Sequence, residues 1–298
     1  MTLAVRADIE RTVEKSFGVR PGGTLRVETH GADINVVQST DPVVKVVARE
    51  RIRASTEAKA DRLLAGLTMA IEQRGNEVTA FAKYGRAILG VPMGSRSAVT
   101  VEFVVTAPAG TTLVLHTAEG KIVVGDFTGD VTVRTTAGDI VLGKIDGEVD
   151  ARTTGGSIAL DEGRRVVKLV AGGGNISVGR AVGPAQFSTT GGDIGVAAVE
   201  SSIQATAKGG NVRVVISGQL NSDSKLKASG GSIKVDCDRR LAFRLDASAG
   251  GGRVDAPALN LTGQKTNRSH SWLKGTVNEG GPLLTLQASG DDIVVWTW

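Results

Sequence analysis

The chain has 298 residues, of which 40 are glycine and one is cysteine, and its formal net charge is +4. A single cysteine excludes an intramolecular disulfide and a cysteine-based metal cluster. A charge of this size is too diluted to indicate nucleic-acid binding on its own. The many glycines and the single tyrosine favour flat, closely stacked turns over a core built around aromatic side chains.

The N-terminus and the hydropathy bear on the location of the protein. Residues 1–16 carry several charges, among them Arg6 and Glu10, so they lack the apolar centre of a signal peptide. No stretch approaches the roughly 18 apolar residues of a membrane span. These features fit a cytoplasmic protein or one whose leader has been removed. Cys237 lies in an aliphatic alternation and is expected to be a buried structural thiol.

Residues 1–116 form an N-terminal region without a regular repeat. It contains one early copy of a motif that returns later, at 29–36, which we expect to form the first edge of the repeat array. Alternating apolar residues predict strands at 43–47 and 99–105. We interpret the region as an α+β cap, because the terminal units of stacked repeats need covering.

Local signals predict further elements within this cap. Ser55-Thr56-Glu57 predicts the start of a helix that ends near Ala65, with an N-cap hydroxyl and an acid in the first turn. Arg74-Gly75-Asn76 predicts a turn between antiparallel strands at 67–73 and 77–83. The glycine-rich segment 84–96 is expected to be a mobile loop.

The remainder of the chain, 117–298, carries a repeat. An aliphatic β-branched residue recurs at five successive intervals of 18 residues and then at two intervals of 21. A period in this range indicates a solenoid in which each repeat stacks on its neighbour. The recurring residues are Ile122, Ile140, Ile158, Ile176, Ile194, Val212, Ile233 and Val254.

Three more columns accompany the aliphatic residue. Glycine stands two residues before it, a polar residue directly before it, and Thr or Ala five residues before it. Glycine followed by Asp, Asn or Ser is typical of tight turns, so we expect tight turns in which the glycine has a positive φ. The Thr/Ala column is expected where the coil narrows. The glycines are Gly120, Gly138, Gly156, Gly174, Gly192, Gly210, Gly231 and Gly252.

The other half of each repeat predicts a second strand. Val131 and Val133 have counterparts at the same offsets in later copies, and a third column contains Phe127 and Ile145. About three inward-facing segments per repeat are enough to close one coil of a β-helix. The sequence therefore predicts an all-β solenoid with coils of 18–21 residues.

The C-terminal part supplies candidate contacts with a ligand or partner. The segment 260–274 is an insertion made basic by Lys265, Arg268 and Lys274, and it either engages an anionic polymer or is a solvated loop. Trp296 and Trp298 alternate onto one strand face. There they either stack on sugar rings or, as we expect, plug the open end of the core.

Two patterns suggest a metal site or a catalytic site, and each has a simpler structural interpretation. Asp139 and Asp193 lie in the polar turn column and resemble a calcium ladder, but acids occur in only some copies, which favours stacked turn caps. Asp130 and Glu148 share a column, as a carbohydrate-cleaving enzyme would require, but a solvated face with ion pairs between coils gives the same pattern. We expect no catalytic residue, cofactor or metal.

Several motifs together point to a family. The run FGVRPGGTLRV at 17–27 is followed by Gly31-Ala32-Asp33-Ile34 and later by serial copies of TTAGDI and TTGGSI. With these motifs, over residues 13–295, the chain resembles a bacterial putative-adhesin family of β-strand-repeat proteins, long described as a domain of unknown function. The resemblance implies a right-handed single-stranded β-helix and a role in the cell envelope.

We therefore expect an α+β cap at 1–116 that merges into the first coil, and β-helix repeats with a C-terminal cap at 117–298. The expected function is that of a non-enzymatic adhesin or cell-envelope interaction or scaffold protein that presents a rigid sheet face to a polysaccharide or surface protein. No nucleic-acid partner is expected. The alternatives are a cytosolic, bactofilin-like polymerising scaffold and, less favoured, a polysaccharide-active β-helix enzyme.

Overall fold

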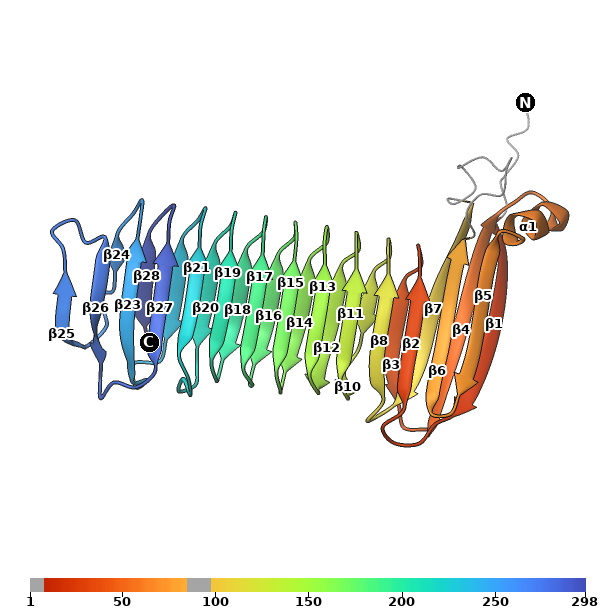
Figure 1. Ribbon diagram of the computed structural model, residues 1–298, viewed down its shortest axis with the longest axis horizontal. Helices are drawn as coiled ribbons and strands as arrows, with labels where there is room; N and C mark the ends of the chain where they lie inside the picture. The colour runs from red at the N-terminus through yellow and green to blue at the C-terminus, as the bar shows by residue number, and fades with distance from the viewer. Residues whose placement is uncertain (1–7, 85–97) are drawn as a thin grey trace, which may run out of the picture. The chain divides into compact units, whose positions relative to one another are not determined.

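The computed structural model describes residues 8–84 and 98–298. Over these residues the protein is all-β with one short helix, and most neighbouring strands run parallel (Figure 1). The chain divides into two compact units, Met1–Asp139 and Ile140–Trp298, which are described separately below. The loop expected at 84–96 lies, after Tyr84, outside the described residues.

The first unit consists of two sheets and the helix. Its elements are β1 (Asp8–Gly18), β2 (Thr24–Thr29), β3 (Ile34–Ser39), β4 (Val43–Arg53), α1 (Glu57–Leu64), β5 (Leu67–Arg74), β6 (Glu77–Tyr84), β7 (Val99–Pro108), β8 (Thr112–Thr117), β9 (Ile122–Val124), β10 (Phe127–Thr128) and β11 (Val131–Thr135). One sheet has the order β1-β4-β7-β3-β9, and the other has the order β5-β6-β2-β8-β11. Inward-facing residues of both sheets, such as Leu25, Ile34 and Phe103, are fully buried and form the core.

The early copy of the motif lies inside the first unit rather than at its edge. β3 pairs parallel with β7 on one side and with β9 on the other, and β2 lies in the same way between β6 and β8. The expectation that 29–36 forms the first edge is therefore wrong. The chain leaves β3, builds β4 to β7 outside it, and then returns to the other side to form β8 and β9.

The predicted helix and hairpin of this region are confirmed. Thr56 is the N-cap of α1, and its hydroxyl accepts a hydrogen bond from the N–H of Lys59 at 3.3 Å. β5 and β6 pair antiparallel around Gly75, whose φ is 61°. Arg11 of β1 holds the helix through ion pairs of 2.7 Å to Glu57 and to Asp61.

The second unit also consists of two sheets. Its strands are β12 (Ile140–Asp146), β13 (Val149–Thr153), β14 (Ile158–Gly163), β15 (Val167–Ala171), β16 (Ile176–Ala181), β17 (Ala185–Thr189), β18 (Ile194–Val199), β19 (Ile203–Ala207), β20 (Val212–Ile216), β21 (Ser224–Ala228), β22 (Ile233–Cys237), β23 (Phe243–Ala249), β24 (Val254–Asp255), β25 (Leu261–Thr266), β26 (Trp272–Val277), β27 (Leu283–Ala288) and β28 (Ile293–Thr297). We call β12-β14-β16-β18-β20-β22-β28-β24 sheet A and β13-β15-β17-β19-β21-β27-β23-β26-β25 sheet B.

The aliphatic columns form the core of the second unit. In sheet A, Ile140 pairs with Ile158, Ile158 with Ile176 and Ile176 with Ile194, each in a parallel register, and all four are at most 1% exposed. Flat strands that carry the same residue at the same level pack without gaps, since their side chains align from strand to strand. The predicted stacking of repeats is confirmed.

The third apolar column does not form a separate segment in the second unit. Ile145 lies in β12, and Ala181 and Val199 lie in β16 and β18, so the column occupies the ends of the sheet A strands. Leu142 and Ile145 are both buried although they are three residues apart, which a regular strand does not allow. The strand must bend between them, so two sheets, rather than three segments, enclose the core.

The last strands of the chain lie between earlier ones. β28 pairs with β22 and with β24, and β27 pairs with β21 and with β23. Ile293 is therefore the neighbour of both Ile233 and Val254, which the even spacing of the sequence had placed next to each other. The periodicity fixes which residues face inward, but it does not fix the order in which the last repeats stack.

The regular spacing of glycine has a different cause from the one expected. None of the eight column glycines has a positive φ, so that expectation is wrong. A Cβ on Gly192 would lie 2.3 Å from the carbonyl oxygen of Gly174, and one on Gly210 would lie 2.4 Å from that of Gly192. The turns of successive repeats thus stack backbone on backbone, and glycine is required because any side chain would overlap the backbone of the preceding turn.

Candidate functional surfaces

Trp296 and Trp298 lie at the C-terminal end of β28, on the outer side of sheet A. They are 49% and 52% exposed, whereas Val295, directly before Trp296, is fully buried. Ile293 and Val295 occupy the inward positions of the strand, so the tryptophans point outward by alternation. The expectation that they plug the core is therefore wrong.

A charged side chain lies opposite Trp296, and the backbone of Trp298 is hydrogen-bonded to the neighbouring strand. Trp296 lies opposite Asp236, whose carboxylate is 3.5 Å from the guanidinium of Arg213. The backbone N–H of Trp298 donates to the carbonyl oxygen of Cys237 at 3.3 Å. An exposed indole ring opposite a carboxylate combines a stacking surface with a hydrogen-bond acceptor, which is the chemistry that a sugar ring needs.

Cys237 is a structural thiol, as predicted. Its side chain is fully buried, and it donates to the carbonyl oxygen of Trp296 at 3.5 Å. Burial, followed by the charges of Asp236 and Asp238, raises the pKa of this thiol to about 12. The thiolate that nucleophilic chemistry requires is therefore suppressed.

The insertion at 260–274 is a β-hairpin and not a solvated loop. β25 pairs antiparallel with β26, with Lys265 opposite Lys274, and β26 pairs antiparallel with β23 (Figure 1). Lys274 forms an ion pair of 2.8 Å with Asp246 of β23. Arg268 is exposed in the turn between the two strands. The hairpin thus extends sheet B by two strands.

The outermost strand of this hairpin is a poor template for further pairing. β25 is exposed along most of its length, and its register with β26 shifts between Thr262 and Lys265. Gly263, within the shift, has a φ of 63°. A bulge and an outward lysine at an edge are typical devices against edge-to-edge association.

The predicted contact residues therefore fall on two surfaces. Lys265, Arg268 and Lys274 belong to the hairpin of sheet B, whereas Trp296 and Trp298 belong to sheet A. No single site gathers all five.

The polar turn column forms a ladder of caps. The side-chain oxygen of Asn175 accepts from the N–H of Asp193 at 2.8 Å, and that of Asp193 accepts from the N–H of Asn211 at 2.6 Å. Ser157 and Asn211 make the same contact with the next residue of the column. These oxygens bind backbone N–H groups, which confirms the interpretation as stacked turn caps.

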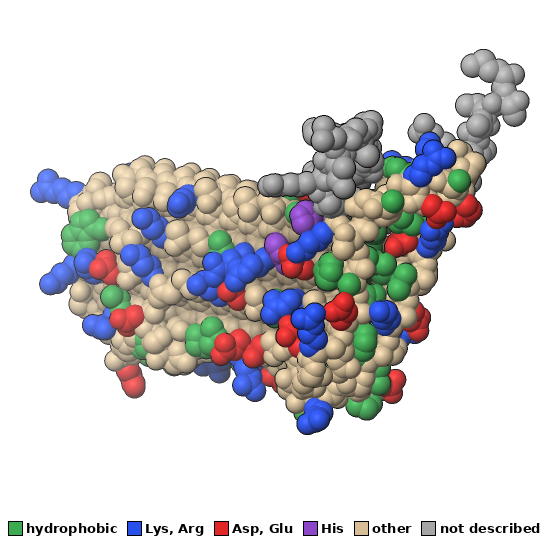
Figure 2. Space-filling view, turned by 45° about the vertical axis from the view of Figure 1, so that its right-hand side comes forward, with side chains coloured by type: hydrophobic (Ala, Val, Ile, Leu, Met, Phe, Trp, Pro, Cys, Tyr) green, Lys and Arg blue, Asp and Glu red, His purple; other side chains and the backbone are tan. Residues whose placement is uncertain are grey.

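Charged side chains of sheet A pair between successive repeats. Glu162 lies 2.7 Å from Arg164 and 3.7 Å from Arg180, which in turn lies 2.6 Å from Glu200. The hydrogen bond from Arg164 holds the pKa of Glu162 below its ordinary value. Lys and Arg also lie beside Asp and Glu over much of the face that Figure 2 presents. Exposed pairs of this kind contribute little to stability, because water and salt screen them.

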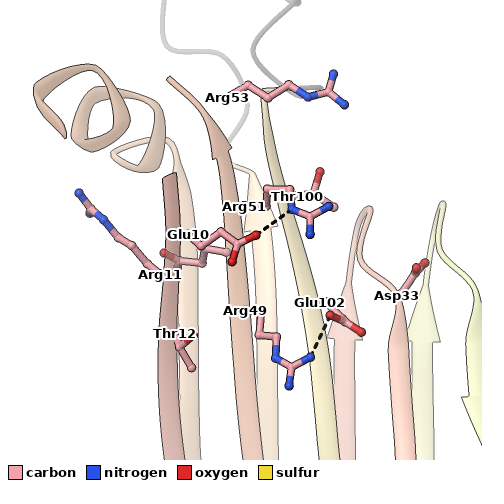
Figure 3. A pocket seen from close by; sticks show the side chains of 10 residues that line it. Glu10, Arg11, Thr12, Asp33, Arg49, Arg51, Arg53, Thr100 and Glu102 are labelled. Atoms are coloured by element: carbon pink, nitrogen blue, oxygen red, sulfur yellow. Dashed lines mark hydrogen bonds and ion pairs between the residues drawn. The ribbon is translucent and has the colours of Figure 1, made fainter. Parts of the chain in front are cut away.

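A charged groove of about 510 Å³ lies on the outer side of β1, β4 and β7 in the first unit. Figure 3 shows Glu10 directed at Arg51 and Glu102 directed at Arg49, with ion-pair distances of 3.3 Å and 3.6 Å. Glu102 also accepts a hydrogen bond from the amide of Asn35 at 2.8 Å. These carboxylates are held by structural partners.

This groove was not predicted from the sequence. Its signal was the alternation of Arg49, Arg51 and Arg53 along one face of a strand, with Glu50 and Ile52 on the other. Asp33 at the groove's margin accepts the N–H of Lys121 at 2.8 Å. Within residues 8–84 and 98–298, no group of three or more His, Cys, Asp or Glu side chains is arranged to hold a metal ion. In the same ranges, no helix has the length and apolarity needed to cross a membrane.

Parallel sheets, stacked turns and aligned core columns define the protein as an all-β, solenoid-like repeat protein. The chain belongs to the family described as Toastrack DUF4097, which matches residues 23–295. The membership confirms the resemblance that the sequence motifs indicated, to a putative-adhesin family of unknown function.

Several solved structures of bacterial proteins resemble this chain. A putative adhesin from Bacteroides fragilis is 12% identical, with 97% of each chain covered and a TM-score of 0.44. A protein described as a putative lipid binding protein, from Parabacteroides distasonis, is 12% identical, with 95% of this chain and 96% of that chain covered and a TM-score of 0.46. A putative cell adhesion protein from Clostridium sporogenes is 12% identical, with 97% and 100% covered and a TM-score of 0.23. No curated protein matches the sequence.

Proposed function

We propose that this protein is a non-enzymatic, adhesin-like interaction protein of the bacterial cell envelope. Its sheet faces present side chains in fixed rows to a polysaccharide or to a surface protein. Because many weak contacts along such a face act together, useful affinity does not require a deep pocket.

We also propose a specific form of solenoid for the repeats. The repeats form a right-handed single-stranded β-helix with coils of 18–21 residues. Residues 1–116 act as its N-terminal cap, and 117–298 contain the repeats and the C-terminal cap.

One observation carries the functional proposal: Trp296 and Trp298 are half exposed at the C-terminal end of β28, where this strand pairs with β22. Exposing two indole rings is unfavourable unless a partner covers them, since each has a large apolar surface. Pairing with β22 fixes the backbone that carries the rings, so little backbone conformational entropy is lost on binding.

The test measures binding of the full chain to a panel of bacterial envelope polysaccharides by isothermal titration calorimetry, which does not depend on the tryptophans as reporters. The double variant W296A/W298A should lose binding to whichever polysaccharide is bound, while W272A should retain it because Trp272 lies in sheet B. Unchanged binding by the double variant would remove the tryptophans from the proposed contact surface.

Localisation tests the envelope role independently. Cells are fractionated, and intact cells are treated with protease. Digestion of the native protein on intact cells supports the proposal. Retention in the cytoplasm together with filament growth would instead support the polymerising scaffold.

A further inference from the structure

The outer face of sheet B carries lysines and neutral polar residues, and no acid, along four neighbouring strands. Along β15, β17, β19 and β21, alternate residues are buried, and the residues between them point outward. We call this surface the lysine face. Its outward residues are Lys168, Val170, Gln186, Ser188, Gln204, Thr206, Lys225 and Lys227.

The lysine face is ordered in two straight rows across the strands. Parallel register places Lys168, Gln186, Gln204 and Lys225 in one row. The same pairings place Val170, Ser188, Thr206 and Lys227 in the other. Neighbouring strands are about 4.8 Å apart, so each row spans about 14 Å.

The lysines of this face carry uncompensated charge. Among the described residues, no carboxylate lies within ion-pair distance of Lys168, Lys225 or Lys227. The acids that flank the face are already held, because Asp150 pairs with Arg152 and Asp246 pairs with Lys274. On sheet A, by comparison, Arg180 and Arg213 both face acidic partners.

We propose that the lysine face binds an extended anionic polysaccharide, of the carboxylate-bearing type, that lies across the strands. The ammonium groups of the lysines face the carboxylates of the polymer, and the amides and hydroxyls between them bind its hydroxyl groups. The site is separate from the tryptophan pair of sheet A, and it rests on the proposed role in polymer binding.

Other anionic partners fit this surface less well. A flat sheet does not enter a groove of duplex DNA, and single-stranded nucleic acid is usually held by stacked aromatic side chains, which the two rows lack. A bilayer surface requires several large apolar side chains to insert. Among the described residues at the margin of this face, only Val166 is large, aliphatic and strongly exposed.

The test measures affinity of the full chain for polygalacturonate, with neutral dextran as the reference polymer. The triple variant K168Q/K225Q/K227Q should bind polygalacturonate about tenfold or more weakly, and its affinity should depend less steeply on salt. The matched control K59Q/K121Q/K234Q removes the same charge from other surfaces and should change affinity less than about twofold. Thermal unfolding shows that both variants are folded.

Three results would overturn the inference. The first is an equal loss in both triple variants, because binding would then follow net charge. The second is binding of duplex DNA or of phosphatidylglycerol vesicles as tightly as polygalacturonate. The third is binding that depends only on Trp296 and Trp298, with the lysine variant unaffected; the proposed function would then stand without this site.

Discussion

The hydroxyl of Thr189 donates a hydrogen bond of 2.8 Å to the carbonyl oxygen of Gly174, which lies in the preceding turn. The same hydroxyl accepts from the N–H of Gly192 at 3.2 Å, in its own turn. Thr135 makes the equivalent pair of contacts with Gly120 and Gly138. The Thr column is therefore a buried polar link between successive turns, and small size is only part of its role.

Removing this link should destabilise the protein. In T189V the shape of the side chain is kept, but one part-buried carbonyl and one part-buried N–H lose their partner, at a cost of about 1–3 kcal/mol. The free energy of unfolding in urea measures the effect. T206V, on the outer face of β19, is the control and should change stability by less than about 0.5 kcal/mol. Equal losses of stability in T189V and T206V would contradict the role of Thr189 as a link between turns.

Because the turns stack backbone on backbone, adding one methyl group at Gly192 should lower the stability of the protein strongly. G192A should cost about 2–4 kcal/mol, because its Cβ would overlap the carbonyl of Gly174. A Cβ on Gly195, three residues later, would meet no atom within 4 Å, so G195A should be nearly neutral. Thermal unfolding of both variants tests this, and an unchanged melting temperature for G192A would refute the close approach.

Glu50 predicts a dependence of stability on pH. It is 7% exposed on the inner side of β4, opposite Arg11, and burial raises its pKa although the charge of Arg11 opposes the shift. A carboxyl whose folded pKa is raised stabilises the fold below its unfolded pKa, and this contribution is lost as pH rises through the folded pKa.

The variant E50Q should therefore unfold at a higher temperature than the parent protein at pH 8. The difference should shrink as the pH falls below about 4, the ordinary range of glutamate. E102Q is the control, since Glu102 is more exposed and binds Arg49 and Asn35; it should not gain stability at pH 8. A lower melting temperature for E50Q at pH 8 would show that its charged form is favoured.

The edge strand β25 predicts that the second unit resists end-to-end association. K265I should promote oligomers that grow with concentration, because it replaces an edge charge with a β-branched apolar residue. K225I, which makes the same change on the internal strand β21, should associate less. Sedimentation velocity over a concentration series distinguishes them. Filaments formed by the parent protein would contradict the protective role of β25.

The sequence predicted the core well because each inward column repeats the same residue type. Ile140, Ile158 and Ile176 are buried in register as the 18-residue interval required. The stacking order near β27 and β28 was not predictable in the same way, because any repeat with the same inward pattern fits beside any other. The order in which the last strands stack depends on individual side chains and on the connecting segments, and the period of the repeat does not indicate either.

The candidate surfaces were predictable only in part. The alternation of Trp296 and Trp298 placed both on one side of a strand, but the inward or outward choice depended on Ile293 and Val295 filling the core. The unpaired state of Lys225 and Lys227 required the positions of acids from distant segments. Ion pairing is a property of the folded chain, and the sequence spacing alone does not contain it.

The position of β27 and β28 between earlier strands has a consequence for synthesis. The ribosome synthesises β21 to β24 before residues 283–297. Until those residues emerge, β21 and β22 each have one edge that is not yet paired with its native neighbour. Premature pairing of β23 with β21 would have to be undone before the late strands enter. Translation speed and chaperone access over this stretch should therefore govern the yield of native protein more strongly than over the regular repeats.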